Sequence, residues 1–185
     1  LSAALGDDFQ LLVRVHQLDK VERYAALQGW PGVVFDHAGR PTVGSYHDRD
    51  FDRAALEHLA DTLRHADVVV NAASSISIDA AAVGTPVVCV DYDAKADVPY
   101  HRSVTRFYDF THQKPVVASG GVTRARSPED VVAAVKRYLA DPTLHAEGRA
   151  RLVREQCHVL DGGSGRRVGE AVLAEAARSM RDRRA

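Results

Sequence analysis

The stretch from Ala66 to Val90 constrains the fold of this 185-residue chain more than any other segment. Two short apolar runs rich in valine flank a small polar turn and an alanine-rich piece that ends at Gly84. Valine runs favour buried strands, alanine favours helices, and glycine commonly follows the end of a helix. The segment therefore predicts a strand over 67–71, a serine-bearing turn, a helix over 75–83 and a strand over 87–91.

The rest of the chain repeats this alternation of strands and helices. Continuous apolar runs predict further strands over 9–16, 32–36 and 116–118. Helical signals predict helices over 48–65, 128–140, 143–157 and from 164 onward. Ser127-Pro-Glu-Asp is a strong start signal for the helix over 128–140. The formal Asp48-x-Asp50 pair is interpreted as a helix cap. We expect helical turns over 21–28, a turn over 37–41 and a long loop over 92–114.

Strands that are apolar throughout are typical of a parallel sheet buried on both faces. Together with the alternation, they predict an α/β fold: a Rossmann-like parallel sheet with helices on both faces, forming one domain over 1–185. No apolar run approaches the roughly 20 residues that span a bilayer. The chain begins at Leu1 without a methionine, so we expect it to be a piece of a longer protein.

Charge and cysteines narrow the functional classes. The formal net charge of −1 offers no global basic field, so we expect no nucleic acid partner. Cys89 and Cys157 show no metal-ligand spacing, and both fit a reducing cytoplasm. We expect no metal and no cofactor.

The serine turn is the first candidate for ligand binding. Ser74, Ser75 and Ser77 follow a predicted strand and open a predicted helix, where anions bind in open α/β sheets. Their hydroxyls could contact a diphosphate, or Ser74 and Ser75 could simply cap the helix. Asp79 lies in the first turns of that helix, where it either supports the helix or contacts the ligand.

A second candidate pair lies at the end of the first predicted strand. Arg14 and His16 point to the same face of that strand. An arginine in an apolar strand needs a partner when buried, and a phosphate or an acid such as Asp161 would serve.

Four patches of the sequence, in this order and spacing, carry a family resemblance. They are Val13 to His16, then Ser74, Ser75, Asp79 and Pro86, then Tyr108 to Phe110 followed by Pro115, and finally Asp161 to Arg167. Over most of residues 10–175 the chain resembles the carboxyl-terminal, nucleotide-binding half of a GT-B glycosyltransferase. It is most similar to bacterial transferases of the CDP-glycerol glycerophosphotransferase and surface-carbohydrate type.

The resemblance implies that this chain binds the donor in the synthesis of cell-surface carbohydrate. The implied donor is a nucleotide-diphospho sugar or a CDP-glycerol-like compound, with no bound metal. The implied donor-binding residues are Arg14, His16, Ser74, Ser75, Ser77, Asp79, His112, Asp161, Ser164 and Arg166. The acceptor site and the general base belong to an amino-terminal domain or a partner chain, so no catalytic residue is assigned here. The whole enzyme would associate peripherally with a membrane.

Two other functions remain open from the residues. The first is a nucleotide-sugar epimerase or hydrolase of the same fold, with its own acid and base. The second is a non-catalytic α/β interaction module, in which the serine turn only caps a helix.

Overall fold

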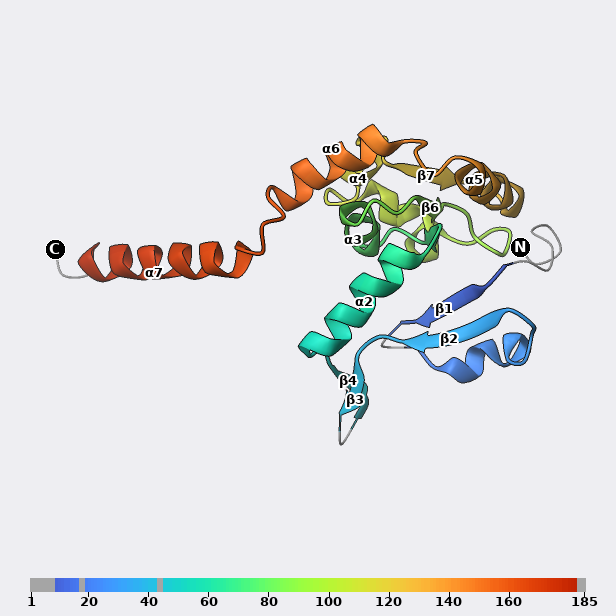
Figure 1. The fold of residues 1–185 in the computed structure, drawn as a ribbon, viewed down its shortest axis with the longest axis horizontal. Helices are drawn as coiled ribbons and strands as arrows, with labels where there is room; N and C mark the ends of the chain where they lie inside the picture. The colour runs from blue at the N-terminus through green and yellow to red at the C-terminus, as the bar shows by residue number, and fades with distance from the viewer. Residues whose placement is uncertain (1–8, 17–18, 43–44, 183–185) are drawn as a thin grey trace.

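The computed structural model describes residues 9–16, 19–42 and 45–182 (Figure 1). Within these residues the strands are β1 (Leu11–Val15), β2 (Val33–His37), β3 (Arg40–Thr42), β4 (Ser45–Asp50), β5 (Val69–Asn71), β6 (Val87–Val90) and β7 (Val122–Ala125), and β2, β3 and β4 follow one another without a helix between them. The α-helices are α2 (Arg53–His65), α3 (Ile76–Ala82), α4 (Lys114–Ala118), α5 (Pro128–Ala140), α6 (Ala146–Cys157) and α7 (Ser164–Asp182). Short 3₁₀ helices are η1 (Val21–Leu27), η2 (Tyr100–Arg102) and η3 (Thr105–Asp109).

The prediction of parallel strand pairing is confirmed, but the prediction of one continuous sheet is wrong. β5, β6 and β7 form a three-stranded parallel sheet, whereas β1 and β2 pair in parallel as a separate two-stranded sheet. The hairpin of β3 and β4 is antiparallel. The result is an α/β fold with small parallel sheets, compatible with a Rossmann-like arrangement.

β6, the middle strand of the three-stranded sheet, is buried on both faces, as its apolar sequence requires. Val87 and Cys89 pack against side chains of α2, α3, α4 and α6 on one face. Val88 packs against α5 on the other face, through Val131, Val135 and their neighbours. Complete burial of one valine side chain stabilises a fold by about 1.5–3 kcal/mol. This sheet therefore holds the main core of the molecule.

The predicted helix over 48–65 starts five residues too early. Residues 45–50 belong to β4, and α2 begins at Arg53. Its N-cap is Asp52, whose carboxylate accepts a 2.8 Å hydrogen bond from the Ala55 amide. Asp48 and Asp50 lie in β4, so the predicted cap position is wrong and Asp52 takes that place. The turn predicted over 37–41 is shorter than expected, because β2 ends at His37 and β3 begins at Arg40.

The strand predicted over 116–118 is wrong, and a real strand follows it. Val116 to Ala118 lie in α4, which has Pro115 in its first turn, a position that suits proline. Gly120, with φ of 72°, provides the left-handed residue that turns the chain out of this helix. The next segment, Val122–Ala125, is β7.

The carboxyl-terminal helices were predicted correctly in type. α5 starts where expected, with the Ser127 hydroxyl accepting a 3.0 Å hydrogen bond from the Asp130 amide. α7 extends away from the rest of the molecule (Figure 1) and leaves an apolar row exposed, which includes Val168, Val172, Leu173 and Met180. Of the helices in the described residues, none combines the length and apolarity of a membrane span.

Candidate functional site

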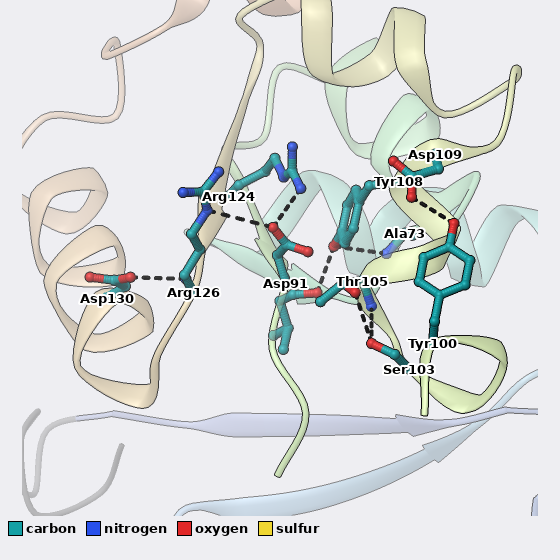
Figure 2. Close-up of polar contacts among 11 residues, drawn as sticks. Ala73, Asp91, Tyr100, Ser103, Thr105, Tyr108, Asp109, Arg124, Arg126 and Asp130 are labelled. Atoms are coloured by element: carbon teal, nitrogen blue, oxygen red, sulfur yellow. Dashed lines mark hydrogen bonds and ion pairs between the residues drawn. The ribbon is translucent and has the colours of Figure 1, made fainter. Parts of the chain in front are cut away.

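The carboxyl edge of the β5–β6–β7 sheet carries a buried acid between two arginines. Asp91 directly follows β6, and its side chain is only 4% exposed. Its Oδ2 accepts a 2.5 Å hydrogen bond from Nη2 of Arg124 in β7, and lies 3.8 Å from Nε of Arg126 (Figure 2). Two guanidinium groups thus share one carboxylate. The Asp130 carboxylate accepts a hydrogen bond from the Arg126 amide, at 2.9 Å, so the two arginines and two acids meet at the edge where ligands bind in open α/β sheets.

Tyr108 of η3 contacts residues from all three segments that form this edge. Its hydroxyl donates a 2.6 Å hydrogen bond to the Val90 carbonyl and accepts a 3.2 Å bond from the Ala73 amide (Figure 2). The guanidinium carbon of Arg124 lies 4.7 Å from the centre of the Tyr108 ring, a distance typical of a cation–π contact. Burial raises the pKa of Tyr108 far above its usual value, so the phenol stays protonated and remains a donor.

The loop after β6 is fixed by a second acid. The Asp93 carboxylate accepts hydrogen bonds from the Ser103 hydroxyl at 2.6 Å and from the Val104 amide at 2.9 Å. These bonds lower the pKa of Asp93. Farther along the loop, the Tyr100 hydroxyl donates to Asp109 at 2.7 Å (Figure 2). The loop therefore holds η3, and with it Tyr108, against the sheet edge.

The serine turn is largely occupied by its own hydrogen bonds. The Ser74 hydroxyl accepts from the Ile76 amide at 3.3 Å, as a local cap would. Ser77 is completely buried, and its hydroxyl exchanges hydrogen bonds with the Asn71 side chain. Ser77 therefore supports the turn and presents no hydroxyl to solvent. Ser75 is exposed, and its side chain makes no cap bond.

Asp79 and His112 lie at exposed positions. Asp79 is on α3, and partial burial of its carboxyl group raises the pKa of Asp79. Burial of the Cys157 thiol, with a smaller contribution from the charge of Asp79, raises the pKa of Cys157. His112 follows η3, with its ring centre 5.7 Å from that of Phe110.

Arg14 finds its partner on the neighbouring strand, and that partner is not Asp161. Its guanidinium pairs with Asp36 of β2, and the other oxygen of Asp36 lies 3.1 Å from Nε2 of His58 on α2. Beside this cluster lies a cavity of about 200 Å³, lined by Arg14, His37, Gly39, Ala54, Ala55 and His58. His16 follows β1 at an exposed position.

Asp161, Ser164 and Arg166 cluster around the start of α7. Both oxygens of Asp161 accept hydrogen bonds from Nη1 of Arg167, at 2.9 and 2.8 Å, and the Gly163 amide donates to Oδ1 at 2.8 Å. Nη2 of Arg167 donates to the Ser164 hydroxyl at 3.1 Å. Arg166 pairs with Glu170 at 2.8 Å and is exposed. In Figure 1 this segment lies beyond the end of α6, whereas β1 lies below α3 in this view.

The predicted site residues therefore fall on separate segments, and the buried cluster at the sheet edge was not predicted. Asp91 directly follows the apolar run over 87–90, so its place at a strand end is visible in the sequence. Arg124 gives no such signal, because β7 is short and interrupted by polar residues. Among the described side chains, no three of His, Cys, Asp or Glu gather as metal ligands would.

Comparison with known proteins adds no relative. No protein-family model, no curated protein and no solved structure matches this chain.

Proposed function

We propose that this chain binds the diphosphate of an activated donor at the carboxyl edge of β5–β6–β7. The observation that carries the proposal is the pair of guanidinium groups, Arg124 and Arg126, held by the buried Asp91. Guanidinium groups bind phosphate oxygens through charge-assisted hydrogen bonds. Arg126 is 76% exposed, so its guanidinium can contact an incoming phosphate at the surface while it stays beside Asp91.

The sequence resemblance indicates the class of donor, and the arginines at the sheet edge offer a site for its diphosphate. The chain would act as the donor-binding domain of a GT-B-type glycosyltransferase or a related glycerophosphotransferase, with a nucleotide-diphospho sugar or a CDP-glycerol-like compound as substrate. The exposed Ser75 hydroxyl follows β5 and lies at the carboxyl end of the same sheet. The acceptor and the general base would come from another domain or chain.

Affinity for nucleoside diphosphates tests the proposal. Titration calorimetry with UDP, CDP, GDP and dTDP is expected to show binding of at least one of them. Arg126→Ala is expected to weaken that binding about 10- to 100-fold, since a hydrogen bond to a charged group contributes about 1.5–3 kcal/mol. Arg137→Ala is the matched control, because Arg137 lies in the last turn of α5, at the opposite end of that helix from Arg126. No binding of any of the four nucleotides, or equal binding by Arg126→Ala, would contradict the proposal.

One observation favours a second function, that of a protein interaction module. α7 leaves Val168, Val172, Leu173 and Met180 more than half exposed along a single helix. Exposed apolar surface of this kind commonly marks a contact with another protein surface. The two functions are compatible, because a donor-binding domain of this type would also contact an acceptor domain.

A further inference from the structure

Asp91 and Arg124 meet through one hydrogen bond, although their side chains could form two. Arginine and a carboxylate frequently pair through two parallel bonds. Here only Nη2 of Arg124 and Oδ2 of Asp91 are joined, at 2.5 Å. Two other atoms of the pair, Nε of Arg124 and Oδ1 of Asp91, are buried without a hydrogen-bond partner among the described atoms. One donor and one acceptor are therefore unused within a single ion pair.

The chemistry of these two atoms restricts what can satisfy both. A carboxylate oxygen only accepts hydrogen bonds, and a guanidinium N–H only donates them. A phosphate oxygen would satisfy Arg124 and not Asp91, whereas an ammonium group would satisfy Asp91 and not Arg124. A hydroxyl group both donates and accepts, so one hydroxyl can satisfy both atoms at once.

We propose that the Asp91–Arg124 pair binds a hydroxyl group of the donor, either on its ribose or on the sugar or polyol that it carries. The hydroxyl donates to Oδ1 of Asp91 and accepts from Nε of Arg124. This inference rests on the proposed function, and it divides the roles at the edge. Arg126 binds phosphate, whereas Asp91 and Arg124 select donors by their hydroxyl groups. Both atoms are covered in the structure, so entry requires the Arg124 side chain, which is 31% exposed, to shift.

Paired titrations test the inference and identify the source of the hydroxyl. UDP against 2′,3′-dideoxy-UDP tests the ribose, whereas UDP-glucose against UDP and CDP-glycerol against CDP test the carried group. In the unmodified chain, at least one hydroxyl-bearing member is expected to bind about tenfold more tightly than its counterpart. Asp91→Asn removes the charge and one acceptor oxygen, and is expected to reduce that ratio below twofold while the diphosphate still binds.

Arg124→Lys provides a second variant, because it keeps the charge and loses the Nε–H donor. It is expected to reduce the ratio as Asp91→Asn does, whereas Arg137→Lys on α5 should leave it unchanged. The inference is overturned if the unmodified chain shows no preference in any pair, as when the two atoms bind only an internal water. It is also overturned if a folded Asp91→Asn or Arg124→Lys variant keeps the preference.

A measurement with glycerol alone separates this inference from the proposed function. If no nucleotide binds, the proposed function fails, and the Arg124 Nε–H signal in a nitrogen-15 NMR spectrum then decides the inference. Glycerol at high concentration is expected to shift that signal in the unmodified chain and not in Asp91→Asn. The absence of a shift would overturn the inference.

Discussion

At the scale of single residues, Tyr108 connects the three segments that form the carboxyl edge. Its hydroxyl bonds the end of β6 through Val90 and the turn after β5 through Ala73, while its ring lies against Arg124 of β7. Ala73 has a φ of 31°, unusual for a residue with a side chain. The bond from its amide to Tyr108 helps to hold that turn in place.

Replacing Tyr108 by phenylalanine is predicted to destabilise the fold. The substitution leaves the part-buried Val90 carbonyl and Ala73 amide without their shared partner, which costs about 1–3 kcal/mol. Urea denaturation followed by circular dichroism measures the change. Tyr100→Phe serves as the control, because its bond to Asp109 is exposed and its loss should change stability by less than about 0.5 kcal/mol. Equal stabilities for the two variants would contradict this role for Tyr108.

At the scale of elements, Asp36 joins β2 to β1 and α2. Burial disfavours its charge, but the hydrogen bond from His58 and the charge of Arg14 outweigh burial and lower the pKa of Asp36. A carboxyl group with a lowered folded-state pKa stabilises the fold above its unfolded-state pKa. That contribution is lost as the pH falls through the folded-state pKa.

Asp36→Asn is therefore predicted to destabilise the chain in a pH-dependent way. At pH 7 we expect a loss of about 1–3 kcal/mol, because bonds to a charged group are removed or weakened. The difference from the unmodified chain should shrink once the pH falls below about 4, the ordinary value for aspartate. Denaturation curves at pH 7 and pH 3 measure it, with the exposed Asp61→Asn on α2 as the control. A difference that stays constant between the two pH values would count against the lowered pKa.

The exposed apolar row of α7 leads to a separate prediction about stability. Leu173 is 72% exposed, so Leu173→Asp removes no packing and should change stability by less than about 0.5 kcal/mol. Leu152 on α6 is completely buried, and Leu152→Ala should cost about 2–5 kcal/mol. Thermal unfolding of both variants tests the contrast. A large loss in Leu173→Asp would show that α7 packs against another surface.

Sequence patterns predicted β6 better than β7, its neighbour in the same sheet. β6 is apolar from Val87 to Val90, and burial on both faces demands that pattern. β7 contains Thr123 and Arg124, because those side chains make polar contacts with Tyr138 and Asp91, so its pattern gave no strand signal. The pairing of Asp91 with Arg124, 33 residues apart, depends on strand order and could not be predicted locally.

At the scale of the whole molecule, the three-stranded sheet forms the centre, with helices on both faces and polar residues at its carboxyl edge. The β1–β2 sheet, with the cavity beside Arg14, forms a second unit, and α7 extends away from the rest (Figure 1). Three regions thus carry the residues that sequence patterns pointed to. We assign the donor diphosphate to the edge of the three-stranded sheet.

A map of amide chemical shifts during titration with nucleoside diphosphates tests that assignment most directly. We predict that the largest shifts occur at the ends of β5, β6 and β7, at residues 72–75, 91–93 and 124–127. Residues beside the Arg14 cavity and at the start of α7 should change little. Shifts concentrated at Arg14 and His58, or at Asp161 to Arg167, with none at the three strand ends, would contradict it.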